Sequence, residues 1–280
     1  MRKLPDTGQT TSYTATFGED HDYTINPPSY TDNENGTITD NVIGLMWQKE
    51  DDNTTRTWSD AGTYCGDLTL GGQNDWRLPS KKEFITIANY GTLNPAINTT
   101  YFPNTNFTWY WSSITAVNDS NSAWSVEFNS GSSSMKSKSS NFYVRCVRGD
   151  AIAESFTDNG NGTITDNVTG LMWQKEDDDV TKTWESALAY CEGLSLGGYT
   201  DWRLPNIMEL NSIVDTTTVS PAINTTYFPN TNSSEYWSST TNANNSSQTW
   251  DVAFHIGSVF NNNMLDKTEG KYVRCVRGGQ

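Results

Sequence analysis

Histidine, the side chain used most often for proton transfer and metal binding near neutral pH, occurs at only two positions, His21 and His255. The chain contains two long segments of similar sequence, and the two histidines do not correspond between them. A Ser-His-Asp triad shared by both segments is therefore excluded, and so is a shared histidine-ligated metal site.

Carboxylates, by contrast, recur at matching positions in the two segments. Two carboxylates can act as the acid and the base or nucleophile of a glycoside hydrolase. The recurring pairs are Asp32/Asp158, Asp40/Asp166, Glu50/Glu176, Asp51/Asp177, Asp52/Asp178 and Asp75/Asp201. The order of the sequence singles out no two of them. We therefore expect a non-enzymatic protein and keep a carbohydrate-active enzyme with paired carboxylates as the alternative.

Two acidic clusters, Glu50 to Asp52 and Glu176 to Asp179, could offer oxygen ligands to calcium. They lack the alternating ligand spacing of a calcium loop, so a solvated acidic loop is the simpler interpretation. The stretch Asp158 to Gly162 resembles such a loop, but the first segment has Glu34 in place of Gly160. We expect no metal site and no cofactor, and leave calcium in the acidic loops open.

The four cysteines fall into two pairs, Cys65 with Cys146 and Cys191 with Cys275. In each segment one cysteine lies in the first expected helix and the other in the last expected strand. An even number with matched placement suggests one disulfide in each segment. Two buried reduced thiols packed together are the alternative. No C-x-x-C spacing occurs, so a zinc site is not indicated.

The elements that must position these residues follow from an internal repeat. Residues 30–128 align without a gap with residues 156–254, at a constant offset of 126. After an insertion of three residues the copies rejoin at Tyr143 and Tyr272. We expect an N-terminal arm, residues 1–29, that packs on the first domain, followed by two domains, residues 30–150 and 151–280.

Each copy combines helix and strand patterns. Asn-Gly turns at 35–36 and 161–162 predict hairpins, and apolar spacing predicts helices over 58–65 and 184–191. Ser80 and Asn206 have the spacing of a capping box and predict a second helix in each copy. Segments rich in aromatic and β-branched residues predict strands over 236–240, 250–254 and 272–276. The fold class is therefore α+β, with two helices and an antiparallel sheet in each copy.

Composition restricts the partners. The net charge is −15, which repels nucleic acid and anionic membranes. No apolar run reaches the length of a membrane span, so we expect no membrane insertion. No apolar segment of signal-peptide length follows the basic residues at the start, so either a signal was removed or the protein leaves its cell by another route, such as assembly into a virus particle.

Several motifs together resemble the collagen-like-adhesin C-terminal domain family. In the second copy they are Thr157–Thr163, Gly170–Lys175, Asp201–Pro205, Tyr236–Ser239 and Tyr272–Arg277, and the first copy matches throughout. The resemblance implies a C-type-lectin-like fold, in which a cysteine of the first helix pairs with one of the last strand. It also implies adhesion to surfaces, in some members to sulfated glycans, a ligand that the charge of −15 disfavours here.

The chain is also similar to the variable proteins of diversity-generating retroelements, which use this fold to display a hypervariable surface, including on virus tails. Those systems mutate adenines, so Asn codons become the variable positions. Asn residues are concentrated just before the Val-Arg-Cys ending of the second copy, at 242, 244, 245 and 261–263.

The stretch that differs most between the copies is residues 116–141 in the first and 242–271 in the second, without the strands that contain Trp124 and Trp250. It is the best binding candidate, because loops on a rigid scaffold often carry recognition. Neutral drift is the alternative explanation. The expected ligand-binding residues are Asn242, Asn244, Asn245, His255, Ser258, Phe260, Asn261, Asn262, Asn263, Met264 and Asp266, with Val259 adding apolar surface. The partner would be a protein or glycan on a target surface, and the location extracellular or on a virion. A structural spacer in a surface fibre is a third possibility.

Overall fold

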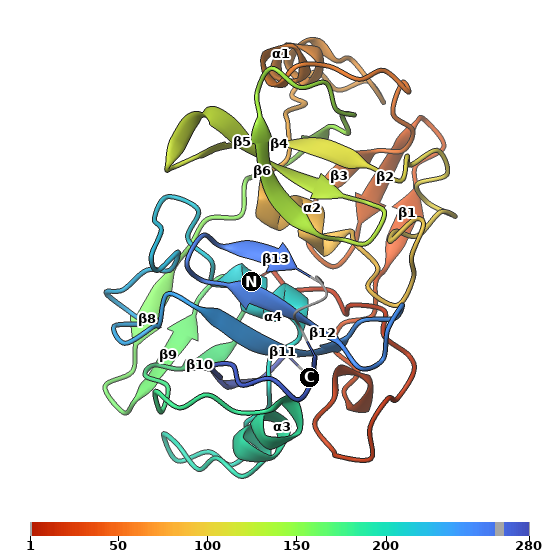
Figure 1. Cartoon of the computed structure of the whole chain (residues 1–280). Coiled ribbons are helices and arrows are strands. Elements are labelled where there is room, and N and C mark those ends of the chain that lie inside the picture. Colours follow the sequence, from red (N-terminus) through yellow and green to blue (C-terminus); the bar gives the residue numbers. More distant parts are fainter. Residues whose placement is uncertain (1, 261–265, 280) are drawn as a thin grey trace. The chain divides into compact units, whose positions relative to one another are not determined.

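The computed structural model describes residues 2–260 and 266–279. The chain forms two compact units (Figure 1). One unit comprises Pro28–Ile152, which is the first repeat. The other joins the segment that ends at Pro27 to the segment that begins at Ala153. The units divide after Ile152, whereas the sequence analysis divided the repeats after residue 150. The N-terminal arm belongs to the unit of the second repeat.

The first repeat contains two antiparallel sheets and two helices. Strands β1 (Tyr30–Asp32), β2 (Thr37–Asp40), β3 (Met46–Gln48) and β7 (Val147–Arg148) form one sheet in that order. Strands β4 (Trp109–Ala116), β5 (Asp119–Glu127) and β6 (Ser133–Ser137) form the other. The two helices, α1 (Trp58–Asp67) and α2 (Lys81–Thr86), lie between β3 and β4 in the chain.

The second repeat has the same order of elements. Its four-stranded sheet contains β8 (Phe156–Asp158), β9 (Thr163–Asp166), β10 (Met172–Gln174) and β14 (Val276–Arg277). Its three-stranded sheet contains β11 (Glu235–Thr241), β12 (Thr249–Ala253) and β13 (Ser258–Phe260). The helices are α3 (Trp184–Glu192) and α4 (Ile207–Ser212). The α+β class is confirmed, with two sheets in each repeat where one was expected.

Local sequence explains the helix starts. The Thr57 hydroxyl caps α1 by accepting from the Asp60 N–H, and Ser80 and Asn206 form complete capping boxes at α2 and α4. Thr183 precedes α3 as expected, but its hydroxyl donates to Ser186 Oγ and makes no cap bond to the backbone.

The last predicted strand, residues 272–276, is divided. Tyr272 forms an isolated bridge with Tyr236 of β11, and only Val276–Arg277 form a strand, beside β10. The segment crosses from one sheet to the other, so it cannot pair continuously with either. Between these points the Cys275 carbonyl accepts from the Gln174 N–H.

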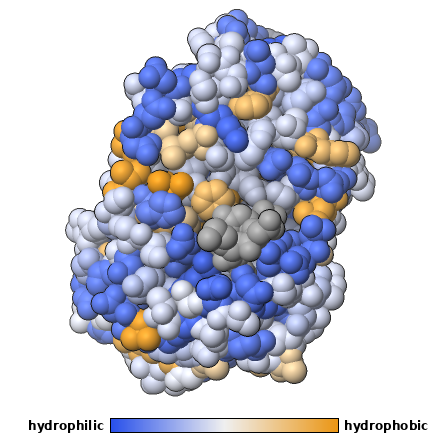
Figure 2. All heavy atoms as spheres, in the orientation of Figure 1, coloured by the Kyte–Doolittle hydropathy of each residue, from blue (hydrophilic) through white to orange (hydrophobic). Residues whose placement is uncertain are grey.

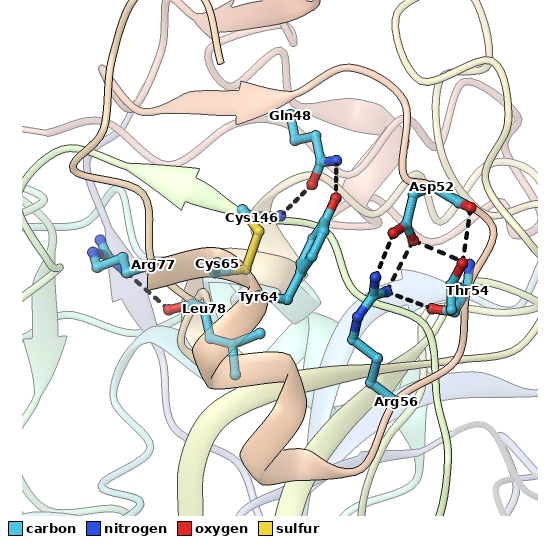
Figure 3. Close-up of a disulfide and its surroundings, with 9 residues drawn as sticks. All are labelled: Gln48, Asp52, Thr54, Arg56, Tyr64, Cys65, Arg77, Leu78 and Cys146. Atoms are coloured by element: carbon cyan, nitrogen blue, oxygen red, sulfur yellow. Dashed lines mark hydrogen bonds and ion pairs between the residues drawn. A yellow bond between two sulfur atoms is a disulfide. The ribbon is translucent and has the colours of Figure 1, made fainter. Parts of the chain in front are cut away.

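The cores are rich in tryptophan, and the disulfides lie in them. Cys65–Cys146 and Cys191–Cys275 are both formed, as the family resemblance implied, and all four residues are fully buried. Each bond ties the first helix of a repeat to the segment that crosses between its sheets. Figure 3 shows how Gln48 supports the first one, accepting from the Cys146 N–H and donating to the Tyr64 hydroxyl.

The expectation that the N-terminal arm packs on the first domain is wrong. The arm, residues 2–27, runs beside α3 of the second repeat (Figure 1) and contains one turn of 3-10 helix, η1 (Asp20–Asp22). Thr240 Oγ1 donates to Asp20 Oδ2 at 2.7 Å, and Thr241 Oγ1 donates to Glu19 Oε1 at 2.6 Å. These bonds join residues more than 200 positions apart, so proximity in the sequence gave the wrong partner.

Removing one disulfide tests the independence of the repeats. The double variant Cys191→Ala/Cys275→Ala should lower the free energy of unfolding of the second repeat by about 4 kcal/mol, because the bond closes a loop of 84 residues. Differential scanning calorimetry should show one of two transitions shifted down. The matched variant Cys65→Ala/Cys146→Ala should shift the other transition, and an equal shift of both transitions in either variant would contradict the expectation.

Candidate functional site

The segment expected to bind a ligand lies on and around the β11–β12–β13 sheet of the second repeat. Two of its residues are buried, Asn242 with 3% and Ser258 with 1% of its surface exposed, and Val259 is fully buried. Asn242 closes the turn between β11 and β12, where its N–H donates to the Gln248 carbonyl and its amide donates to Gln248 Oε1. The expectation that these three residues form contact surface is wrong, because Ser258 and Val259 lie in β13, which packs into the core, and Asn242 is enclosed by its contacts with Gln248.

The rest of the described segment is accessible. Asn244 and Asn245 are exposed at the tip of the β11–β12 turn. His255, Phe260 and Asp266 are half-buried: His255 follows β12, Phe260 ends β13, and Asp266 forms a bridge with Gln248 beside the β11–β12 turn. Asn261, Asn262, Asn263 and Met264 lie outside the described residues. The structure therefore brings the accessible residues to two places, the β11–β12 turn and the flanks of β13.

Beneath this surface lies a carboxylate that the sequence did not single out. Asp251 is fully buried in β12, and among the described residues none donates a hydrogen bond to either of its oxygens. Burial raises its pKa to about 8, although Lys271 Nζ at 3.7 Å from Oδ2 opposes the rise, while Glu235 adds to it. The first copy has Ser125 here, whose hydroxyl donates to the Ser134 carbonyl. The sequence feature that could have indicated this buried carboxylate is an acidic residue between Trp250 and Val252.

Three of the six recurring pairs of carboxylates have basic partners at the surface. Each bond is repeated in the second copy, and Figure 3 shows the one between Asp52 and Arg56. The pairs are Asp32–Lys49, Asp158–Lys175, Asp52–Arg56, Asp178–Lys182, Asp75–Arg148 and Asp201–Arg277. The lysine hydrogen bond lowers the pKa of Asp32, and the guanidinium bond of Arg148 does the same for Asp75.

The other recurring carboxylates are structural or exposed. Asp40 Oδ1 accepts from the N–H groups of Val42 and Ile43, and burial raises the pKa of Asp40 to about 6. Asp51 Oδ2 accepts from the Tyr110 hydroxyl at 2.5 Å, a contact that Asp177 and Tyr236 repeat. Glu50 and Glu176 are exposed. Over residues 2–260 and 266–279, no three His, Cys, Asp or Glu side chains are grouped so as to hold a metal ion.

The repeated frame, with one disulfide and one crossing segment in each copy, defines a tandem α+β domain protein. The model of the Lcl C-terminal domain matches twice, over residues 36–148 and 162–277. The chain belongs to this family, and the resemblance carried by its motifs is confirmed. A search of the curated proteins finds no match. Among the described helices, none is long and apolar enough to cross a membrane.

The buried Asp251 makes a testable contribution to stability. Between about pH 4 and pH 8 the folded chain holds a proton on Asp251 that the unfolded chain releases, so the free energy of unfolding should fall as the pH rises through this window. The slope from one such group is at most about 1.4 kcal/mol per pH unit.

Asp251→Ser restores the residue of the first copy and should flatten the decline. Urea unfolding at pH 5 and pH 8 measures the difference between variant and parent. Ser125→Ala, at the matching position of the first repeat, is the control and should leave the pH dependence unchanged. A parent and an Asp251→Ser variant with the same pH dependence would show that Asp251 titrates normally.

Proposed function

We propose that this protein recognises a ligand without catalysing a reaction, and that the ligand-binding surface is the accessible part of the second repeat's divergent segment. The observation that carries the proposal is the contrast between the copies. They share their frame of helices, strands and disulfides, and they diverge on and around the three-stranded sheet. The contact residues would be Asn244, Asn245, His255, Phe260 and Asp266, together with Asn261–Met264.

The engaged state of the recurring carboxylates supports a non-enzymatic function. A glycosidase needs one carboxyl group that can give up a proton and one that can attack or activate water. Here the matching carboxylates accept from lysine, arginine, tyrosine or backbone donors, except for the exposed Glu50 and Glu176. Each repeat therefore uses the candidate acids to hold its own loops.

Membership of the family supports an adhesin-like or surface role, and the two disulfides suit an oxidising compartment. In this proposal the domains have the C-type-lectin-like fold, and the chain is displayed on a cell or virion, where a retroelement diversifies the Asn-rich positions. An adjacent reverse transcriptase gene and a near-repeat of the 3′ end would support that last step. The partner is a protein or a glycan on the target surface.

The ligand class can be narrowed by charge. Hydrophilic side chains cover most of the face drawn in Figure 2, with hydrophobic ones in small separate patches, and the net charge is −15. A sulfated glycan would meet a repulsive field. We expect the full chain to pass through a heparin column at about 0.15 M salt, where the screening length is about 8 Å. Retention that weakens as salt is added would reassign the ligand to sulfated glycans.

A matched pair of substitutions locates the surface. His255→Ala should leave folding intact, because an accessible position changes stability by about 0.5 kcal/mol or less. If it is a contact, it should weaken binding by about 1 to 2 kcal/mol. The control is Asn129→Ala in the first repeat, since Asn129 follows Phe128 as His255 follows Phe254.

Binding of the labelled full chain to a printed glycan array and to intact cells provides the measurement. A combined variant, Asn244→Ala/His255→Ala/Phe260→Ala, should lose binding that Asn129→Ala keeps. The proposal fails if binding survives the triple variant or if the first-repeat control removes it.

A further inference from the structure

The N-terminal arm fills a groove of the second repeat between α3, the start of α4 and β11. The Thr14 hydroxyl donates to Glu185 Oε1 at 2.6 Å, and the Tyr23 hydroxyl donates to Glu192. The guanidinium carbon of Arg203 lies 5.3 Å from the centroid of the Tyr23 ring. Other residues along the arm are packed as well, since Leu4, Thr7, Gln9 and Ile25 are buried.

The first repeat has the same groove, and there it is open. Its volume is about 640 Å³, and its walls come from α1, from the segment before α2, from β4 and from Ala151 and Ile152 at the end of the unit. Among its lining residues, Ser59, Gly66, Arg77 and Ile114 occupy the positions of Glu185, Glu192, Arg203 and Thr240. The positions that hold the arm in the second repeat thus line an open groove in the first repeat.

The polar groups that bind the arm are replaced in the first repeat. Ser59 and Gly66 stand where Glu185 and Glu192 accept hydrogen bonds, and Ile114 stands where Thr240 donates to Asp20. Gly62 replaces the buried Leu188. A Cβ atom added at Gly62 or Gly66 would meet no atom within 4 Å, so both glycines open the groove.

Other parts of the groove are retained. Arg77 is held by Glu83 as Arg203 is held by Glu209, but its side chain is 31% exposed where that of Arg203 is 2% exposed. In the second repeat the aromatic ring of Tyr23 lies over the guanidinium of Arg203.

Beside Ile114, the threonine–lysine pair that binds Glu19 of the arm in the second repeat is also kept. Lys138 Nζ donates to Thr115 Oγ1 at 2.8 Å, as Lys267 Nζ donates to Thr241 Oγ1 at 3.0 Å. In the second repeat Thr241 Oγ1 donates in turn to Glu19 of the arm. The first repeat can therefore still receive a carboxylate at this point.

The chain's own arm does not suit the open groove. Asp20 would face the methyl groups of Ile114 where it now accepts from Thr240, and a buried carboxylate without that donor is unfavourable. An arm of a further copy that entered this groove would also leave the groove of its own second repeat open. The occupant is accordingly a segment of a different protein.

We propose that the open groove of the first repeat binds an extended segment of another protein, with an acidic residue followed directly by an aliphatic residue and, three positions later, by an aromatic residue. The acidic side chain accepts from Thr115 beside Lys138. The aliphatic side chain packs on Ile114. The aromatic ring covers Arg77 and extends over Gly66. This site is separate from the ligand-binding surface proposed for the second repeat.

A peptide built from the arm tests this complementarity. The probe is residues 4–26 with Asp20→Val and Tyr23→Phe, labelled with a fluorophore, and the unchanged arm peptide is its comparison. Fluorescence anisotropy with the full chain should show the altered peptide binding at least about tenfold tighter, because a valine replaces a carboxylate that would lose its donor. The second groove stays closed to both peptides, since the tethered arm has a far higher effective concentration.

Gly62→Leu introduces the side chain of the second repeat and should abolish binding by filling the groove. Gly62→Ala, which adds a single methyl group, is the matched control and should keep it. The triple variant Ser59→Glu/Gly66→Glu/Ile114→Thr should reverse the preference toward the unchanged arm peptide.

Three results would overturn the proposal. They are no binding of the altered peptide, binding that Gly62→Leu leaves unchanged, and tighter binding of the unchanged arm peptide to the parent chain. The last result would assign the groove to arms of further copies.

Discussion

Each repeat is organised around the buried arginine that precedes its second cysteine, Arg145 or Arg274. Arg145 is fully buried, and it donates to the carbonyls of Gln48 and Lys49 and to the Thr105 hydroxyl, with Asp51 Oδ2 at 3.5 Å. A guanidinium removed from water is unfavourable unless its donors are matched and its charge is paired. The end of β3, the acidic loop and the loop before β4 must therefore all meet at this point. Arg274 makes the same contacts in the second repeat.

The neighbouring residues of the Val-Arg-Cys-Val-Arg ending extend this anchor. The cysteine after the buried arginine binds the first helix, and Arg148 pairs with Asp75 two residues before Arg77. Arg77 in turn pairs with Glu83, the residue that completes the capping box of α2. The motifs that identify the family are thus joined to one another by charge pairs and a disulfide. This is why they recur in both copies although the loops between them differ.

Features decided by nearby residues could be predicted from the sequence. The hairpins follow from Asn-Gly turns, and the second helix of each copy follows from a capping box, as at Ser80. Features decided by distant residues could not. The arm's partners, Thr240 and Thr241, lie more than 200 residues away. At the candidate site, the exposure of Asn244 and Asn245 was predicted, whereas Ser258 looked equally polar and is buried by the packing of β13.

The two repeats have diverged at different places, and the arm explains part of the difference. In the second repeat the arm covers the groove, so Leu188 and the polar residues around it are constrained to fit one fixed occupant. In the first repeat the groove holds no arm of its own unit, although Ala151 and Ile152 form part of its lining, and Gly62, Gly66 and Ile114 stand in place of Leu188, Glu192 and Thr240. An exposed guanidinium and a half-exposed Trp58 would gain by being covered. Duplication of one frame has thus left the first copy with an open groove and the second with an altered sheet edge, so that one chain can present two unlike surfaces.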